Sequence, residues 1–420
     1  MSTPTDAPAD DRADNEPSDE ASVRAEVRQW LERHWDRSLD RRDWLTLVAD
    51  SGWAAPSWPS AWHGRGLPPR MTNVVRAEFE AAGADGTAQD KNNLWANTVL
   101  SFGTDELKSE FLRPLLLGQV GMCLLYSEPG AGSDLAAVQT RAERDGDEWV
   151  VNGQKVWTSS GREADYALLI ARTDWDVPKH RGITFFWFPM RQPGVEVRPL
   201  RQATGDSRFN EVFLTDARVP HVNVLGEQNN GWMVLQTALQ YERAVMGENQ
   251  RRRRTQSSAE AVRSADDAAP APVPDLSLVE LARSVGKADD PVVRQRLAAL
   301  HALVTVNGWN NRRAKAEIAQ GSTSSVVSLG KLAMSRILHT AGSLQTELLG
   351  AEGMVGGDDS PRSADATYAL LNAFFTSIGG GTDQIQRNII GERILGLPKE
   401  PELDKTVAFR DVRKAPGHRS

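Results

Sequence analysis

The sequence predicts an α+β multidomain protein with a helical N-terminal domain, a middle antiparallel β barrel or sandwich, and a C-terminal bundle of the four-helix type. Apolar residues recur at helical spacing in the first and last parts of the chain, and short runs of β-branched and aromatic residues lie between them. A chain of 420 residues also exceeds the size at which one core keeps growing. We therefore predict domains over residues 21–124, 125–230 and 231–400, with tails at 1–20 and 401–420.

The first domain follows a stretch rich in Asp, Pro and Ala. Residues 1–20 contain neither an apolar segment nor a basic start, which predicts a disordered tail and not a signal peptide. Val23, Val27 and Leu31 then recur at the spacing of one helix face. The helices predicted here are Ser22–Trp35, Asp43–Ser51, Met71–Ala82, Asn92–Phe102 and Asp105–Leu117.

The middle domain is predicted from short runs that are too brief for helices. Asp145-Gly146 and Asn152-Gly153 are typical turn sequences between such runs. Many short strands joined by tight turns indicate a barrel or sandwich. The predicted strands are Val138–Ala142, Glu148–Val151, Gln154–Thr158, Tyr166–Arg172, Gly182–Pro189, Val195–Arg198 and Asn210–Val219.

Helical periodicity returns beyond Gly231 and continues to about Leu397. The Pro- and Ala-rich stretch Asp266–Asp275 predicts a flexible connection inside this region. Several helices in succession predict a bundle. They are Trp232–Arg254, Leu276–Glu317, Ser325–Leu349, Asp365–Phe375 and Thr382–Leu395.

The amino-acid composition of the chain indicates which classes of partner and which cellular setting to expect. With 49 basic and 56 acidic residues the net charge is -7, which favours neither nucleic acid nor a membrane surface as the main partner. The run Arg251–Arg254 would point in different directions on a helix and form no continuous basic face. No apolar run approaches the roughly 20 residues of a membrane span, and the scattered histidines predict no metal site. The single cysteine, Cys123, cannot form an internal disulfide, which favours the cytoplasm.

The stretch Ser127–Asp134 is the strongest candidate for a ligand site. It reads Ser-Glu-Pro-Gly-Ala-Gly-Ser-Asp and follows the apolar run Met122–Tyr126, so it predicts a tight turn at the end of a buried segment. Glycines let backbone N–H groups approach a ligand closely. Because an ordinary loop can have the same composition, the other motifs must decide between the two interpretations.

Three motifs together resemble the acyl-CoA dehydrogenase family. Ser127–Asp134, followed by Leu-Ala-Ala, resembles the first signature of the family, Val151–Ser159 resembles its flavin strand, and Gly381–Ile390 resembles its second signature. The resemblance extends from about Ser22 to Leu397. It implies flavin adenine dinucleotide (FAD) as cofactor, an acyl-CoA substrate that is desaturated between its α and β carbons, electron transfer flavoprotein as acceptor, and a homotetramer or a heterotetramer with a related subunit.

The resemblance also implies which residues bind the flavin. Trp157 would cover one edge of the isoalloxazine ring, although an ordinary core tryptophan is the alternative, and Ser133 would contact a flavin phosphate or the pantetheine arm of the substrate. Ala351, in the turn Leu349–Gly353, would touch the adenosine half across a subunit interface. Glu347 departs from the glutamine common in the family, and Arg283–Lys287 lacks the phenylalanine of the corresponding block. The implied flavin-binding set is Leu125, Ser127, Gly132, Ser133, Trp157, Ser159, Ala351, Thr382 and Gln384.

The catalytic base is the main open question. Removal of an α proton needs a base, and many family members have a glutamate two residues before the threonine of the second signature, where this chain has Gly380. The chain is then a catalytically silent subunit, or its base is Glu242, as in members that act on branched or bulky acyl groups and take their base from that helix. The glycine at position 380 and the resemblance favour Glu242 as the base, and an exposed or salt-bridged glutamate is the alternative interpretation. Arg243 and Gly380 would border the substrate, with an ion-pair role as the alternative for Arg243.

The resemblance to actinobacterial members predicts a bulky acyl group, such as a steroid side chain or a cyclic acid. Two alternatives stay open. One is a structural subunit that completes the flavin site of another chain in a heteromeric acyl-CoA dehydrogenase. The other is different flavin chemistry on a substrate without coenzyme A, as an oxidase or monooxygenase.

Overall fold

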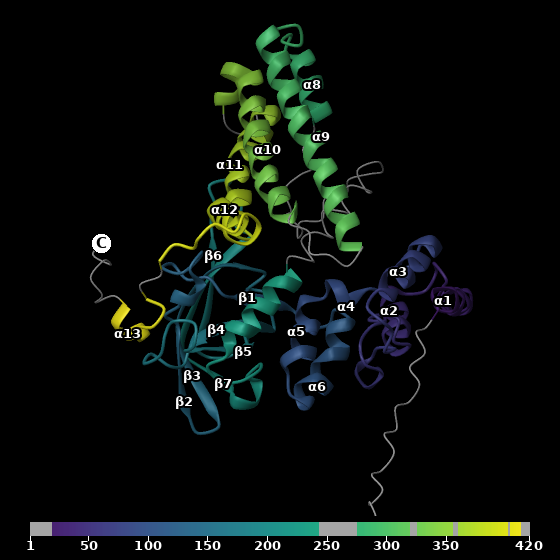
Figure 1. Ribbon diagram of the computed structural model, residues 1–420, viewed down its shortest axis with the longest axis vertical. Coiled ribbons are helices and arrows are strands. Elements are labelled where there is room, and N and C mark those ends of the chain that lie inside the picture. The colour runs from purple at the N-terminus through teal and green to yellow at the C-terminus, as the bar shows by residue number, and fades with distance from the viewer. Residues whose placement is uncertain (1–18, 243–274, 320–325, 356–359, 402–403, 413–420) are drawn as a thin grey trace, which may run out of the picture. The chain divides into compact units, whose positions relative to one another are not determined.

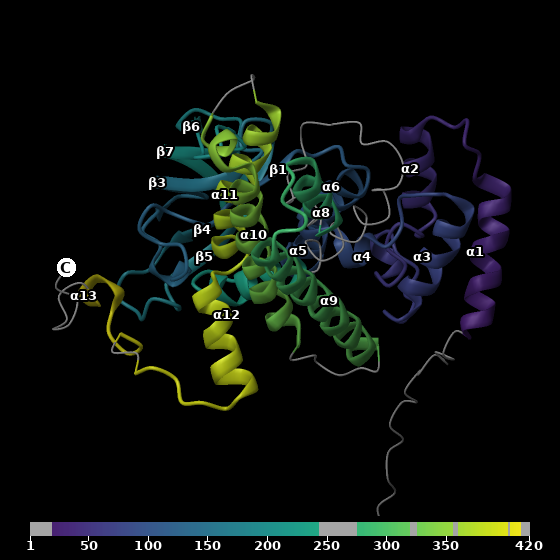
Figure 2. The same ribbon diagram turned by 90° about the horizontal axis from the view of Figure 1, so that it is seen from above.

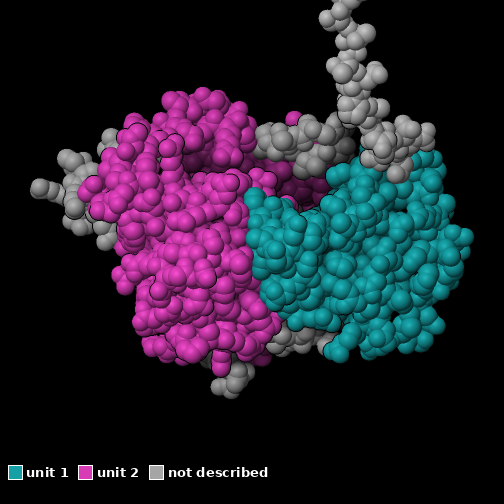
Figure 3. Space-filling view, turned by 90° about the horizontal axis from the view of Figure 1, so that it is seen from below, with its two compact units in different colours: residues 1–120 teal, residues 121–420 magenta. Residues whose placement is uncertain are grey.

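The computed structural model describes residues 19–242, 275–319, 326–355, 360–401 and 404–412 (Figure 1). The chain divides into two compact units, residues 1–120 and 121–420, and each is described by itself (Figure 3). Several predictions concern residues outside the described ranges, and they are the tail before residue 19, Arg243, the run Arg251–Arg254 and the connection up to residue 274. Among the described residues, no helix combines the length and apolarity that crossing a membrane requires.

The first unit is helical, as predicted. Helix α2 begins because the Asp40 carboxylate accepts the Arg42 backbone N–H at 2.8 Å, and Thr104 caps α6 in the same way. Trp44 is fully buried among Trp30, Trp35 and Phe79, with ring centroids 4.6–6.2 Å away. The α-helices are α1 (Glu20–His34), α2 (Arg41–Asp50), α3 (Met71–Ala82), α4 (Gln89–Asn92), α5 (Leu94–Phe102) and α6 (Asp105–Leu116).

The second unit contains a seven-stranded sheet with the order β1-β4-β2-β3-β7-β6, in which β5 pairs with β4. Figure 2 shows β6, β7 and β3 side by side. The fold class is confirmed, but the sheet is mixed and not wholly antiparallel, because β1 runs parallel to β4 and one pair joins β2 and β4 in parallel. The strands are β1 (Met122–Leu125), β2 (Arg141–Asp145), β3 (Glu148–Ser159), β4 (Tyr166–Arg172), β5 (Ile183–Pro189), β6 (Val195–Leu200) and β7 (Phe209–Pro220).

One of the two predicted turns in this sheet is correct. Asp145-Gly146 lies in the hairpin between β2 and β3, where Asp145 pairs with Glu148. Asn152-Gly153 is not a turn, since β3 continues through it with a register shift against β7. The Asn152 side chain exchanges two hydrogen bonds of 3.0 Å with Asp216 on β7, and a Cβ on Gly153 would lie 2.4 Å from Thr140 Oγ1. A long-range contact therefore replaces the local turn.

The C-terminal helices form a bundle whose core is built from α8, α9 and α10 (Figure 1). The predicted helix Leu276–Glu317 is wrong as a single helix. It is divided because Gly286 has a φ of 71°, and because Asp290 accepts the backbone N–H groups of Val292 and Val293 at the start of α9. The helices are α8 (Asp275–Ser284), α9 (Pro291–Ala319), α10 (Val326–Leu349), α11 (Pro361–Ile378) and α12 (Asp383–Ile389), followed by a π-helical turn, Ile390–Ile394.

Two further segments of the second unit lie against the sheet. Residues 231–242 form a helix that begins on β5, where a Cβ on Gly231 would lie 2.7 Å from the Phe185 backbone nitrogen. Its Val234, Leu235 and Ala238 side chains are buried. The short helix α13 (Phe409–Val412) lies beside the sheet near the end of the chain (Figure 1).

Candidate active site

The turn Ser127–Asp134 directly follows β1. The backbones of Glu128 and Ala131 exchange hydrogen bonds of 2.9 and 3.1 Å across Pro129-Gly130, which makes this part of the stretch very tight. A Cβ on either Gly130 or Gly132 would meet nothing within 4 Å. The backbone at these glycines therefore faces open space, as a ligand-binding turn requires.

A buried ion pair fastens one end of this turn to β3. Lys155 Nζ lies 2.8 Å from Glu128 Oε1 and donates to the Tyr126 carbonyl at 3.1 Å. The same carboxylate accepts the backbone N–H groups of Gln139 and Thr140 at 2.6 and 2.9 Å. Burial acts to raise the pKa of Glu128, but the Lys155 charge and these hydrogen bonds together lower it. Glu128 is thus an ionised anchor for its own turn and not a reacting group.

A buried arginine holds the segment that follows the turn. Arg172, at the end of β4, donates to the carbonyls of Ala136, Val138 and Lys179 at 2.6, 3.0 and 3.1 Å. Its side chain is fully buried, and burial lowers its pKa to about 10. Because three carbonyls accept from one guanidinium, Arg172 fixes the 3₁₀ turn Leu135–Ala137 against the sheet.

The flavin strand of the sequence motif lies beside this turn. The Val156 backbone N–H donates to the Ser127 carbonyl at 2.9 Å, and Thr158 Oγ1 donates to the Leu124 carbonyl at 3.2 Å. Between Lys155 and Thr158 the register shifts, and Trp157 has a φ of 65°. Such a conformation is strained for a bulky residue and is common at functional sites.

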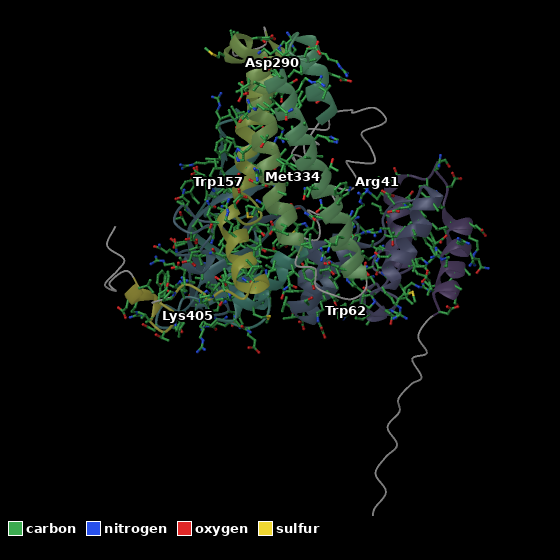
Figure 4. The ribbon with its side chains drawn as sticks, turned by 45° about the horizontal axis from the view of Figure 1, so that its top comes forward. Arg41, Trp62, Trp157, Asp290, Met334 and Lys405 are labelled. Atoms are coloured by element: carbon green, nitrogen blue, oxygen red, sulfur yellow. The ribbon has the colours of Figure 1, made fainter. Side chains whose placement is uncertain are left out.

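Trp157 is 57% exposed, so the alternative of an ordinary core tryptophan is wrong for this chain (Figure 4). Aromatic contacts connect it to the second signature. The Trp157 and Phe209 centroids are 5.8 Å apart at 86°, and Phe209 lies 5.8 Å from Phe375 of α11. The Gly379 N–H donates to the Phe375 carbonyl at 2.7 Å. A row of aromatic contacts therefore runs from Trp157 to the end of α11, just before the second signature.

The link between α11 and α12 is a glycine turn. Gly380 and Gly381 have φ values of 65° and 93°, which glycine adopts at little cost. Thr382 then caps α12 by accepting the Ile385 N–H at 3.2 Å, and this leaves Gln384 exposed in the first turn of the helix. Both residues thus start the helix beside the turn, where the second signature places them.

A polar cluster secures α12 to the neighbouring helices. Asp383 Oδ2 accepts the Ser335 hydroxyl of α10 at 2.7 Å, and Ser335 Oγ lies 2.8 Å from Ser377 Oγ of α11. His339 Nε2 lies 2.6 Å from the same Ser377 oxygen. Lys331 donates to the Thr376 carbonyl. This cluster holds the glycine turn at a defined place between the three helices.

The charge of Glu242 acts on Tyr126, which stands just before the first signature. It lies half-buried at the end of the described helix 231–242. The pKa of Tyr126 is raised well above its ordinary value, first by burial and then by the negative charge of Glu242. The Tyr126 hydroxyl is buried and has no hydrogen-bond partner among the described residues. The charge of this half-buried carboxylate therefore acts on the residue just before Ser127.

Ala351 lies apart from this group within the chain. It belongs to the 3₁₀ turn Gly350–Met354, which follows α10. At about 1.5 Å of rise per residue, the end of α10 lies about 20 Å from Ser335, which contacts α12. Figure 4 labels Asp290 at the far end of the bundle, where a cavity of about 160 Å³ is lined in part by Asp290, Lys287 and Glu347.

Glu347 and the block Arg283–Lys287, which both depart from the family pattern, contact each other at this end of α10. Lys287 Nζ donates to the carbonyls of Glu347 and Leu348 at 3.0 and 2.9 Å. The Glu347 carboxylate forms an ion pair with Arg296. The glutamate is thus neutralised by a neighbouring arginine, and the lysine stabilises the C-terminal end of α10.

Sequence reasoning missed three basic residues that position the turn, and they are Lys155, Arg172 and Lys179. Lys155 stands inside a motif and Arg172 ends a β-branched and aromatic run, but neither position reveals its partner. Lys179, in the loop after β4, lies 2.9 Å from Asp134 Oδ2. Within the described ranges, no group of three or more His, Cys, Asp and Glu side chains could hold a metal ion.

Comparison with known families matches most of the chain. The N-terminal, middle and C-terminal domain models of acyl-CoA dehydrogenase match residues 18–119, 123–217 and 278–395. The acyl-CoA dehydrogenase IpdE1 of Mycobacterium tuberculosis is 36% identical over 375 residues, which cover 86% of this chain and 89% of that protein. FadE26 of the same organism is 33% identical over 85% of this chain and 88% of its own length.

Solved structures agree with these matches. The steroid acyl-CoA dehydrogenase Tcur3481-Tcur3483 superimposes with a TM-score of 0.63 and 27% identity, over 92% of this chain and 99% of that chain. The ChsE4-ChsE5 complex of Mycobacterium tuberculosis gives a TM-score of 0.60 and 28% identity, over 93% and 100%.

The fold, the three motifs and these matches define a flavin-dependent dehydrogenase of acyl thioesters. In particular, the chain belongs to the acyl-CoA dehydrogenase family, whose members use FAD.

Proposed function

We propose that this protein desaturates a bulky or branched acyl-CoA and that Glu242 removes the α proton. The observation that supports the proposal is the half-buried carboxylate of Glu242 at the end of helix 231–242, whose charge acts on Tyr126 just before the glycine-rich turn. Gly380 has no side chain that could take a proton, although it stands where many family members have the catalytic glutamate. A base on helix 231–242 supplies the function that this position lacks.

The residues around the turn fit FAD. Leu125, Ser127, Gly132 and Ser133 would hold it from the first signature, where the glycine backbone faces open space. Trp157 would cover the ring system, since its side chain is exposed and its backbone is held at a positive φ. Ser159, Thr382 and Gln384 would complete the site, and Ala351 would contact the adenosine half in a neighbouring subunit. When bound, FAD supplies the acceptor for the hydride that leaves the β carbon.

The protein's own residues then hold the substrate and move one proton. The Glu242 carboxylate would take the proton from the α carbon, while Arg243 and Gly380 would border the acyl group. A glycine at position 380 leaves volume beside the α carbon, which is the basis for proposing a bulky or branched acyl group. Burial and the nearby negative charge keep the Tyr126 hydroxyl protonated at neutral pH.

Glu242→Gln tests this assignment. The holoenzyme is mixed anaerobically with a panel of straight, branched and steroid-side-chain CoA thioesters, and bleaching of the flavin absorbance is followed. Loss of the general base should slow bleaching by about 10²–10⁴-fold while the bound flavin remains. Glu227→Gln, an exposed carboxylate in the loop before the same helix, should bleach at the wild-type rate. Wild-type bleaching by the Glu242 variant would refute the assignment.

A heteromeric assembly is a second candidate, because two of the matched structures carry names of paired proteins. In this alternative the chain completes the flavin site of a related subunit and is itself silent. Purified alone, such a chain would contain no flavin until the partner is co-expressed. We propose electron transfer flavoprotein as the electron acceptor and the cytoplasm as the setting in either assembly.

A further inference from the structure

The segment 404–412 lies against the sheet and binds the loop between β4 and β5. The Phe409 and Arg410 backbone N–H groups donate to the carbonyls of Val177 and Trp175 at 2.9 and 3.0 Å. Figure 1 shows α13 beside the sheet, and Figure 4 labels Lys405 in the same segment. This segment lies beyond residue 395, where the match to the C-terminal family domain ends.

Phe409 covers the buried arginine that holds the segment after the signature turn. The Arg172 guanidinium carbon lies 3.6 Å from the centroid of the Phe409 ring, within the range of a cation–π interaction. The N–H groups of the same guanidinium donate to the carbonyls of Ala136 and Val138. Phe409 therefore excludes water from a group that fixes the backbone next to Asp134.

Lys179 makes a second link between the same two parts of the chain. Its Nζ atom lies 2.9 Å from Asp134 Oδ2 and 2.8 Å from Asp404 Oδ2. The side chains of Lys179 and Asp404 are only 11% and 14% exposed, so this bridge is screened less than a surface ion pair. One ammonium thus ties the last residue of the turn to the C-terminal segment.

We propose that residues 404–412 position the Ser133–Asp134 end of the turn, through Lys179 and Arg172, for a ligand that carries phosphate or amide groups. The opposite end of the turn is already fixed by Glu128 and Lys155. Ser133 is exposed, so its hydroxyl and N–H are accessible to a ligand, and a held backbone keeps them in one orientation for binding. The ligand is the flavin pyrophosphate or the pantetheine arm of coenzyme A, and this choice of ligand rests on the proposed function.

Two variants weaken the links separately. Asp404→Asn removes one charge from the Lys179 bridge, and Phe409→Leu removes the ring over Arg172 but keeps an apolar side chain. Phe409→Trp retains an aromatic face and should restore wild-type binding. Arg410→Gln is the matched control, because it breaks the exposed ion pair with Asp176 in the same segment without touching Lys179 or Arg172.

Binding is measured in two titrations, FAD with the apoprotein and coenzyme A with the flavin-loaded protein. Asp404→Asn and Phe409→Leu should each raise at least one Kd by about three- to tenfold, while the kcat of the loaded enzyme stays near that of the control. A raised Kd for FAD identifies the pyrophosphate as the positioned group, and a raised Kd for coenzyme A identifies the pantetheine arm. Both Kd values within about twofold of the control would overturn the proposal.

Hydrogen exchange separates this proposal from the proposed function. Peptides that cover residues 127–140 should exchange faster in Phe409→Leu than in Arg410→Gln, whether or not any ligand binds. If the wild-type protein binds neither FAD nor coenzyme A, the proposed function fails, and the exchange result still decides whether the segment holds the turn. Equal exchange in the two variants would refute the link.

Discussion

Replacing Lys155 with methionine should detach the glycine-rich turn from β3. The two side chains of the pair are 0% and 7% exposed, with Nζ and Oε1 2.8 Å apart. Removing one partner of a buried ion pair costs about 3–5 kcal/mol, because the other charge stays buried without compensation. Two backbone N–H groups still bind Glu128, so we expect the lower end, about 3 kcal/mol. The pair lies in the unit of residues 121–420, and at about 2.1 cal/mol/K of unfolding entropy per residue this loss lowers the melting midpoint by about 5 °C.

The assay follows the release of flavin fluorescence from the holoenzyme during heating. Arg141→Met is the control, since Arg141 and Glu143 lie 3.9 Å apart on β2 with side chains 53% and 64% exposed. Such a surface pair contributes at most about 1 kcal/mol. The double variant Glu128→Gln/Lys155→Met should recover part of the loss, because it leaves no buried charge. A midpoint for Lys155→Met within about 2 °C of the control would refute the anchoring role.

Two further predictions concern the same site. The pKa of Glu128 is lowered in the folded protein, so its stabilising contribution is complete above the ordinary pKa of glutamate and is lost as the pH falls through the folded value. The flavin-release midpoint of the wild type should therefore fall more steeply on acidification than that of Glu128→Gln, and parallel curves would contradict this. Trp157→Ala should weaken FAD binding to the apoprotein by about three- to tenfold, through loss of one aromatic contact. An unchanged Kd in a fluorescence titration would place the flavin elsewhere.

Elements with local signals could be predicted from the sequence. Met71–Ala82 was predicted with both ends correct, since its apolar spacing is regular and Gly83 ends the helix at a φ of 70°. Tyr166–Arg172 was also predicted with both ends correct, as a continuous run buried in the sheet. The prediction of a turn at Asn152-Gly153 is wrong because a turn sequence is only a local signal. The Asn152 side chain binds Asp216, which lies 64 residues later in the chain.

The motifs of the candidate site could be recognised in the sequence, but which of their side chains are buried and which are exposed could not be predicted. Alternation along a regular strand would put Lys155 and Trp157 on the same face. The register shift between Lys155 and Thr158 breaks this alternation, so that Lys155 is fully buried and Trp157 is exposed. A strand lysine is ordinarily expected in solvent. Its burial depends on Glu128, and no local pattern in β3 indicates that partner.

The two carboxylates of the turn Ser127–Asp134 already have structural roles. This is why we place the catalytic base on another element. Glu128 is held by Lys155 and two backbone N–H groups, and Asp134 is held by Lys179, so both carboxylates of the turn are engaged in keeping its backbone in place. A general base must instead accept a proton in the transition state. The turn can therefore be rigid, as cofactor binding requires, only if the proton is taken by a group from another element. We propose Glu242, on helix 231–242, as that group.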